Sequence, residues 1–396
     1  MPCGPSTRRT RWLIGGVTIM VGAAFLALFG IQPPTDTQNA AHSEAVTDIL
    51  DADNNSAGYA HADGPRTFTF PADHGPHPRF KHEWWYFTGN VDDSAGHRFG
   101  YQLTFFRIAL SPRPRPGRSA WGTNQLYMAH FALTDVAGDA FHAFQRFQRG
   151  ALGLAGAEAR PFHVWADDWS VAAVTPGATF PVHLHAARDG FEVDLVLQRG
   201  KPVVLQGDRG LSRKSSAPGN ASYYYSLTRM PTRGVVRLKD HTFHVQGASW
   251  MDREWSTSAL ARDQTGWDWF ALQLSDDTEL MYYRLRNNMG GIDPHSSGTL
   301  VFPDGRSRHL SGSELKITVL NWWKSPHSGA RYPETWRVEV PGQDLSLHIT
   351  PLLTDQELNL AVTYWEGAVK IAGSSHGSPV TGSGYVEMTG YTDRGR

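Results

Sequence analysis

Two acidic side chains at alternate positions of one aromatic segment are the best candidates for chemistry in this sequence. The segment runs GASWMDREW over residues 247–255. If it is extended, Trp250, Asp252 and Glu254 lie on one face, because side chains alternate along a strand. Two neighbouring carboxyl groups on an aromatic face repel each other, so one keeps its proton at a raised pKa. A carboxylic acid kept neutral near pH 7 can serve as a general acid.

The same alternation sends Arg253 and Trp255 to the opposite face. This leaves open a structural alternative, in which the two acids make ion pairs and only hold the sheet closed. The arginines available for such pairs include Arg229, Arg253 and Arg262.

A run of three tyrosines upstream is the second candidate. In the segment SYYYS over residues 222–226, Tyr223 and Tyr225 share one face of a strand. Their phenol groups could donate a proton, orient a water molecule or stack on a polyene. Tyrosine is also an ordinary strand residue, so the run could serve packing alone.

Other kinds of site have little support. His183 and His185 would present two imidazoles on one face, but spacing supplies no third ligand, so no metal site is expected. No serine lies in a Gly-x-Ser-x-Gly motif, and the glycines around Ser383 precede no helix that could bind phosphate. We expect no cofactor. A formal net charge of −1 without a basic stripe argues against nucleic acid as a partner.

Short aromatic and β-branched runs between turn residues predict an all-β body. A hairpin is expected over residues 83–108 and another over 267–285. Aligning their Asp-Asp turns places Trp85 over Trp269, a faint repeat that suggests two related β halves.

Many short strands with frequent turns favour β-barrels or β-sandwiches. We expect one domain over residues 66–230 and a second over 231–396, with short helical segments only at 151–159 and 354–360. The 14 Trp, 13 Tyr and 19 Phe exceed what strand preference explains, and an apolar cavity would use the surplus.

The N-terminal segment predicts export. Three arginines within residues 8–11 precede an uncharged apolar run at 12–31, which fits a secretory signal or an uncleaved membrane anchor. The arginines would hold the short end in the cytoplasm while the rest is translocated. We therefore expect a signal or anchor over residues 1–32 and a flexible linker over 33–65. The body would be periplasmic or tethered to the outer face of the inner membrane.

Five separated motifs resemble the AttH-like proteins and the related carotenoid 1,2-hydratase (hydroxyneurosporene synthase) family. In chain order they are HEWWYFTGN at 82–90, YYYS at 223–226, SWMDREW at 249–255, YWEG at 364–367 and GYVEMTGY at 384–391. The resemblance spans roughly residues 68–391 and implies two lipocalin-like, calycin-type domains. It also implies that some relatives add water to an isolated carbon–carbon double bond of a terpenoid without a cofactor.

The resemblance also implies roles for single residues. The acid of the hydratases is an Asp two residues after an aromatic, which matches Asp252 and Trp250. A His and a Trp of the hydratases fall on Tyr223 and Tyr225, so a carotenoid substrate is not implied. We place the two tyrosines with Asp252 and Trp250 as catalytic residues. The residues expected to contact the ligand are Trp85, Glu254, Trp255 and Trp269.

Two functions follow from these observations. The first is a cofactor-free hydro-lyase, in which an acid protonates an alkene and aromatic faces stabilise the cation by about 0.5–2 kcal/mol per contact. The second is a non-catalytic periplasmic carrier of a lipophile, or an accessory of an inner-membrane ABC export system, as the resemblance permits. In a third, purely structural interpretation, the aromatics fill cores and leave no cavity.

Overall fold

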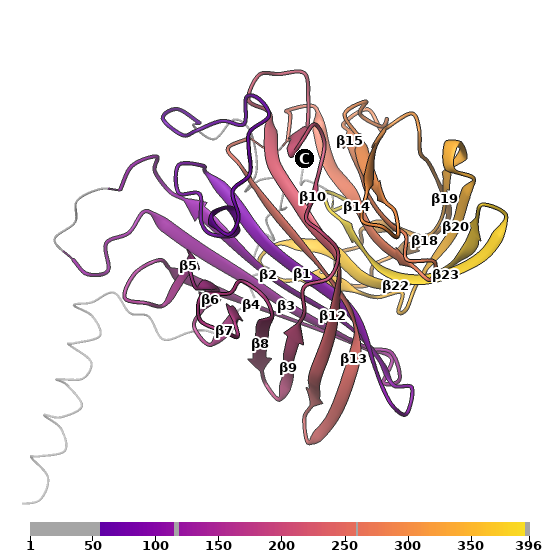
Figure 1. Ribbon diagram of the computed structural model, residues 1–396, viewed down its shortest axis with the longest axis horizontal. Coiled ribbons are helices and arrows are strands. Elements are labelled where there is room, and N and C mark those ends of the chain that lie inside the picture. The colour runs from indigo at the N-terminus through magenta and orange to yellow at the C-terminus, as the bar shows by residue number, and fades with distance from the viewer. Residues whose placement is uncertain (1–55, 115–118, 259, 393–396) are drawn as a thin grey trace, which may run out of the picture. The chain divides into compact units, whose positions relative to one another are not determined.

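Two antiparallel sheets hold nearly all the secondary structure of residues 56–114, 119–258 and 260–392, the residues that this computed structural model describes (Figure 1). One sheet has 13 strands and the other has 10. Within the described residues, the helical elements are two short 3-10 turns, Ala72–His74 and Pro341–Gln343. The all-β class expected from the sequence is confirmed.

The first sheet takes the earlier strands and the second takes the later ones. The strands of the first sheet are β1 (His82–Asp93), β2 (Arg98–Ala109), β3 (Gln125–Asp135), β4 (Ala140–Arg149), β5 (Ala155–Ala159), β6 (Phe162–Ala166), β7 (Trp169–Ala173), β8 (Val182–Arg188), β9 (Phe191–Leu197), β10 (Val204–Leu205), β11 (Leu211–Arg213), β12 (Ala221–Leu238) and β13 (His241–Ser256). Those of the second are β14 (Gln264–Leu274), β15 (Glu279–Asn287), β16 (Ser297–Val301), β17 (Ser307–Ser311), β18 (Lys316–Lys324), β19 (Arg331–Val340), β20 (Leu345–Pro351), β21 (Glu357–Asn359), β22 (Thr363–Ser375) and β23 (Ser378–Met388).

The central strands of the two sheets meet. In the first sheet β1 lies between β2 and β13, and β12 follows β13; in the second, β23 lies between β14 and β22. Strands β1, β2 and β12 contact β23, β22 and β14, and Figure 1 shows the orange and yellow second sheet beside the central strands of the first. Side chains on the facing surfaces can therefore form one site.

Each sheet has its own hydrophobic core, because alternate side chains of a strand point to opposite faces. In β1, Trp85 and Phe87 enter the core of the first sheet. In β14, Phe270 enters the core of the second. Tyr86 and Trp269, one position away on the same strands, belong instead to a cluster between the sheets. The aromatic surplus thus fills two cores and the junction between them.

The junction is tight beside this cluster. A Cβ atom placed on Gly100 of β2 would lie only 2.4 Å from the Cβ of Ala368 on β22, so glycine permits the close approach. Nearby, Asn90 Nδ2 donates a hydrogen bond to the carbonyl oxygen of Gly384 at 3.0 Å. Packing and hydrogen bonds of this kind fix the two sheets against each other.

Both expected hairpins are present, as β1–β2 and β14–β15. The short helices expected at 151–159 and 354–360 are wrong, since the described elements there are strands β5 and β21. Gly153, with a positive φ of 73°, and Gly156 interrupt the first segment, and a neighbouring strand supplies β5 and β21 with hydrogen bonds.

The boundary expected near residue 230 falls inside β12. The chain passes from the first sheet to the second between Ser256 and Gln264. A register shift between Leu227 and Met230 marks a bulge, and Pro231 follows it in the strand without ending it. The expected boundary therefore lies at an irregularity of one long strand.

The last residues of the expected linker, 56–65, are held by hydrogen bonds instead of forming a flexible tether. Tyr59 Oη donates a hydrogen bond to the carbonyl oxygen of Ala109 at 2.6 Å, and the carbonyl oxygen of Gly64 accepts one from Tyr223 Oη at 2.9 Å. Residues 56–65 therefore pack on the first sheet.

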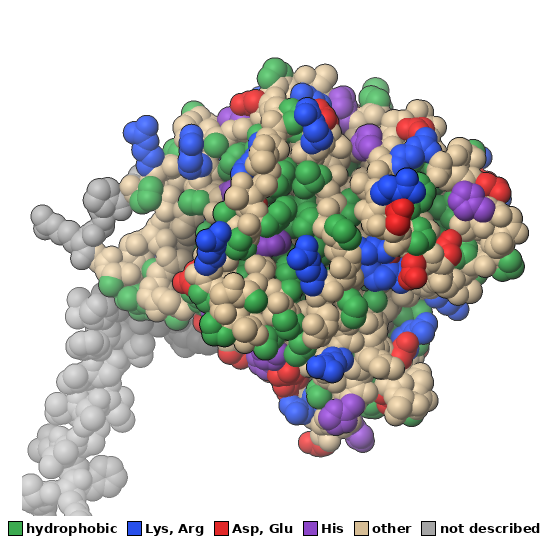
Figure 2. Space-filling view, in the orientation of Figure 1, with side chains coloured by type: hydrophobic (Ala, Val, Ile, Leu, Met, Phe, Trp, Pro, Cys, Tyr) green, Lys and Arg blue, Asp and Glu red, His purple; other side chains and the backbone are tan. Residues whose placement is uncertain are grey.

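The expected signal or anchor and the start of the linker, within residues 1–55, lie outside the described residues. In the part of the chain that is described, no helix has the length and apolar character needed to cross a membrane. On the face shown in Figure 2, hydrophobic side chains gather near the centre, and acidic and basic side chains lie interspersed around them.

Candidate active site between the sheets

A cleft between the two sheets is the candidate functional site. It holds about 760 Å³ of empty space, counting its open mouth. Its wall is mostly aromatic and aliphatic with a few ionisable groups, the usual composition of a small-molecule site. The residues that line it are Trp84, Tyr86, Phe106, Lys214, Tyr224, Asp252 and Glu254 from the first sheet and the loops beside it, then Leu260, and Trp267, Trp269, Tyr283, Leu285, Tyr364 and Glu387 from the second.

Asp252 lies at the wall of this cleft and accepts hydrogen bonds from three side chains. Ser226 Oγ and Trp250 Nε1 donate to Oδ1 at 2.5 Å and 2.7 Å, and Tyr224 Oη donates to Oδ2. Trp269 Nε1, from the second sheet, donates to Tyr224 Oη at 3.0 Å. A chain of hydrogen bonds thus joins Asp252 to the opposite wall.

Opposing effects set the ionisation of Asp252. Burial raises the pKa of its carboxyl group, the three hydrogen bonds lower it and the neighbouring Glu254 raises it, with a net pKa of about 7. Both forms are therefore populated near neutral pH, so Asp252 can give or take a proton there.

Glu254 lies two residues after Asp252 on the same face of β13, and it forms an ion pair. Its Oε1 accepts a hydrogen bond from Ser222 Oγ and lies 3.2 Å from Lys214 Nζ. Burial alone would lower the pKa of Lys214, but the charge of Glu254 raises it above its ordinary value. Lys214 Nζ also lies 4.0 Å from the centre of the Tyr283 ring.

Two of the arginines considered as partners for these acids bond elsewhere. Arg253 donates to Glu83 and Arg229 donates to Glu279. The hydrogen bonds of Asp252 come from neutral donors, so the ion-pair alternative does not describe this residue.

Trp269 is the aromatic centre of the cleft. Its ring centroid lies 5.0 Å from that of Tyr86 and 6.2 Å from that of Trp250, both in edge-to-face geometry. Of the expected site residues, Asp252, Glu254 and Trp269 line the cleft, and Trp250 contacts Asp252 and Trp269 without lining it.

Four other expected site residues lie outside the cleft. Tyr223 and Tyr225 point to the opposite face of β12, where Tyr223 bonds Gly64 and Tyr225 Oη bonds His74 Nδ1 at 2.5 Å. Trp255 also lies on that face, stacked 3.7 Å from the ring of His77. The placement of these three residues in the site is wrong, because the register of β12 and β13 turns them away from Asp252.

Trp85 is the fourth expected site residue that lies outside the cleft. It lies in the core of the first sheet, and its Nε1 donates to the carbonyl oxygen of His74 at 2.8 Å. The alignment of the two hairpins matched Trp85 with Trp269, but Trp85 faces the core of its own sheet and Trp269 faces the cleft. Aromatics occupy both faces of each strand, so the repeat could not identify the face.

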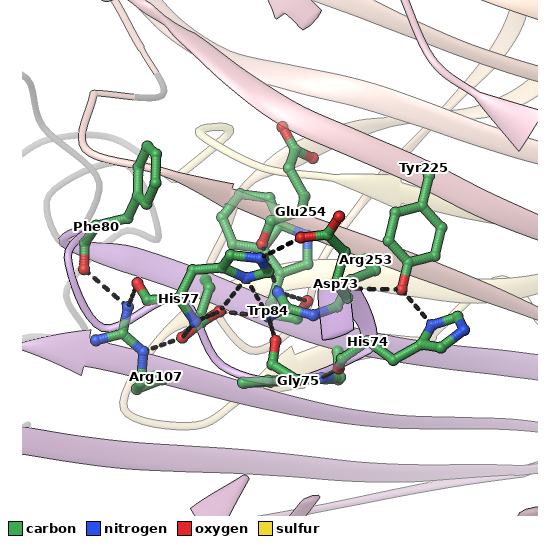
Figure 3. A network of polar contacts seen from close by, with 12 residues as sticks. Asp73, His74, Gly75, His77, Phe80, Trp84, Arg107, Tyr225, Arg253 and Glu254 are labelled. Atoms are coloured by element: carbon green, nitrogen blue, oxygen red, sulfur yellow. Dashed lines mark hydrogen bonds and ion pairs between the residues drawn. The ribbon is translucent and has the colours of Figure 1, made fainter. Parts of the chain in front are cut away.

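The opposite face of β1 and β13 carries a buried ionic network (Figure 3). Glu83 accepts hydrogen bonds from Arg107 and Arg253 and from the backbone N–H of His77. Burial would raise the pKa of Glu83, but the two arginines hold it well below its ordinary value. In Figure 3, Glu254 points away from this network, as the strand alternation requires.

Tyr224 is the tyrosine that sequence reasoning missed. The register pairs Ser226 with Asp252 and Tyr224 with Glu254, so these side chains share a face. The sequence did carry a signal, since Ser222, Tyr224 and Ser226 form an alternating row of hydroxyl donors suited to two carboxylates.

One group of potential metal ligands lies among the described residues, away from the cleft. Ligand atoms of His185, Glu192 and Asp194 all lie within 4.8 Å of one another on β8 and β9. Glu192 also pairs with Arg237, and Asp194 with His183, so their charges already have protein partners.

A family model described as AttH-like matches residues 61–391. No curated protein matches the sequence. Among solved structures, an AttH protein from Nitrosomonas europaea is 32% identical with a TM-score of 0.74, and the match covers 83% of this chain and 100% of that one.

Two further structures share the fold at low identity. Kievitone hydratase from Nectria haematococca has a TM-score of 0.65 at 14% identity, over 84% of this chain and 96% of its own. CghA has a TM-score of 0.53 at 14% identity, over 88% and 98%. At this identity the likeness concerns the fold, which is the expected one of two lipocalin-like β halves.

Proposed function

The chain belongs to the AttH-like family, and from this premise we propose that it is a cofactor-free hydratase of a bulky apolar alkene, such as a terpenoid or another lipid-like molecule. The fold that it shares with kievitone hydratase supports a hydratase. The observation that carries the proposal is Asp252, a buried acid with a pKa of about 7 in the wall of an aromatic cleft.

Hydration of an alkene needs what this cleft contains. Protonating a trisubstituted double bond gives a tertiary cation, which aromatic faces that line the cleft, such as those of Tyr86 and Trp269, stabilise by about 0.5–2 kcal/mol per contact. Burial makes proton transfer from a carboxylic acid effective near neutral pH. Asp252 exchanges the proton with substrate or water, and Tyr224 holds its carboxyl group in place.

The test is addition of water to an alkene panel. We expect the purified full chain to convert at least one terpenoid or polyene in ¹⁸O-labelled water to a product heavier by one labelled water. Mass spectrometry detects the product, and heat-denatured protein is the control. Absence of addition across the panel contradicts the proposal.

A carrier of a lipophile is the second candidate, favoured by the open mouth and apolar wall of the cleft. It would work outside the inner membrane, alone or beside an ABC export system, and this location depends on the N-terminal arginines and apolar run. A carrier should yield an apolar molecule on native mass spectrometry of the purified protein, and it should show no turnover.

Removing one hydroxyl group beside Asp252 should slow turnover. Tyr224→Phe loses the hydrogen bond to Asp252, and a hydrogen bond to a charged group contributes about 1.5–3 kcal/mol, so we expect turnover to fall about 10- to 100-fold. Tyr225→Phe is the matched control, since its hydroxyl bonds His74 on the other face. Steady-state rates decide the comparison, and equal effects of the two variants would contradict the role of Tyr224.

A further inference from the structure

A pair of glutamates in the second sheet forms a separate acidic centre at the cleft. Glu366 on β22 lies directly opposite Glu387 on β23 in the antiparallel register. Glu387 lines the cleft, and its Oε1 accepts a hydrogen bond from Trp267 Nε1 at 2.6 Å. Glu366 lies behind it, fully buried, and its Oε1 accepts one from Tyr86 Oη at 2.6 Å.

The surroundings oppose ionisation of both carboxyl groups. The charges that act on the pair are negative, from Glu387 on Glu366 and from Glu254 on Glu387. Glu366 Oε2 is buried and no donor among the described residues bonds it. A proton on Oε2, turned toward Glu387, satisfies this oxygen and removes the repulsion.

The directions of the pKa shifts of Glu366 and Glu387 agree with this geometry. Burial raises the pKa of Glu387 to about 7 and, with the charge of Glu387, raises the pKa of Glu366 well above its ordinary value. The titratable groups that face the pair from neighbouring strands are Tyr86, Glu254, Tyr364 and Tyr385. The tyrosines are neutral near pH 7, so they supply no countercharge.

We infer that Glu387, with Glu366 as its positioning residue, is a second proton-exchanging group of the cleft, placed on the sheet opposite to Asp252. Asp252 accepts three hydrogen bonds, which favour its carboxylate, whereas burial and negative neighbours favour the protonated form of both glutamates. Glu387 is therefore the donor and Asp252 the acceptor. The catalytic part of this inference rests on the proposed function.

The proton balance of hydration is then complete. The π electrons of the alkene form a C–H bond with the proton of Glu387, and the O–H bond of Glu387 breaks. This leaves a carboxylate on Glu387 and a cation at the other alkene carbon. A water oxygen attacks that carbon, and the Asp252 carboxylate takes the proton that the water loses. Glu366, still protonated, donates a hydrogen bond to the new Glu387 carboxylate. Solvent at the open mouth returns the proton from Asp252 to Glu387.

Infrared spectroscopy tests, without a substrate, whether the carboxyl groups of Glu366 and Glu387 are protonated. At pH 7 we expect the full chain to show a carbonyl stretching band of protonated carboxyl groups, and this band should weaken in the double variant Glu366→Gln, Glu387→Gln. Glu357→Gln is the matched control, because Glu357 is a buried glutamate bonded by Ser325, Ser328 and Tyr332. Equal bands in the wild type and the double variant would overturn the inference. If the double variant does not fold, Glu366→Gln alone provides the comparison.

Turnover tests the catalytic part separately. With an alkene that the wild type hydrates, Glu387→Gln should lower turnover by about 10²-fold or more and leave the dissociation constant of that alkene unchanged. Glu366→Gln should shift the alkaline limb of the pH profile, which a merely structural residue would not move. A Glu387→Gln variant with wild-type turnover overturns the inference and leaves the hydratase proposal standing. Failure of the wild type on every alkene rejects the hydratase proposal, while the infrared band still decides the shared proton.

Discussion

Asp252→Asn should abolish most hydration while leaving ligand binding intact. Asparagine keeps the shape of the side chain and an oxygen that can accept from Ser226 and Trp250, but it cannot take a proton. Positioned acid–base groups contribute about 10²–10⁴-fold to a rate, so a fall in that range is expected. Quenching of tryptophan fluorescence by the alkene measures binding, because Trp269 lines the cleft.

Asp304→Asn is the control for this variant. Asp304 is exposed on the turn between β16 and β17, pairs with Arg306 and is not among the residues that line the cleft. It should change neither turnover nor binding. Wild-type turnover in Asp252→Asn would contradict an acid–base role, and unchanged binding with no turnover even in the wild type would favour the carrier.

The pH profile of the Glu387→Gln variant gives the direction of proton transfer at Asp252, because Glu387 no longer titrates in it. Burial raises the pKa of Asp252 to about 7, so an acceptor role requires turnover to rise as pH increases through about 7. A donor role requires the opposite, a fall over the same range. In the wild type Glu387 must also be protonated to donate, and its pKa is likewise about 7, so the two requirements together should give a bell-shaped profile centred near pH 7.

Side-chain alternation explains what the sequence could predict of this site. The motif at 247–255 is a strand, and its alternation correctly placed Trp250, Asp252 and Glu254 together and Arg253 on the other face. This inference needed no partner strand, because alternation follows from local geometry alone.

Pairing between distant strands explains what the sequence could not predict. Whether Tyr224 or its two neighbours face Asp252 depends on the register of β12 against β13, and a shift by one residue exchanges the faces. The motifs that contain Glu366 and Glu387 were visible, but only the contacts of β22 with β2 and of β23 with β1 place them at the cleft. The bulge at Leu227–Met230 likewise hid the length of β12.

Glu83→Gln should destabilise the fold severely without touching the cleft. The variant leaves Arg107 and Arg253, both fully buried, without their shared counter-charge. Removing one partner of a buried ion pair costs about 3–5 kcal/mol, because the remaining charge stays desolvated. Arg253 lies 3.8 Å from the ring centroid of Trp85, so it cannot reach water without disturbing the core of the first sheet. Urea unfolding followed by circular dichroism measures the loss.

The same substitution at an exposed pair separates burial from chemistry. Glu314 lies 2.6 Å from Arg308 at the surface, where solvent screens the ion pair, so Glu314→Gln should change stability little. Because the pKa of Glu83 is lowered in the folded chain, its stabilisation is present above the ordinary carboxyl pKa and is lost as pH falls below it. The deficit of Glu83→Gln should therefore shrink in acid. A loss no larger than that of Glu314→Gln at neutral pH would show that the network on the far face of β13 does not hold the strand that carries Asp252.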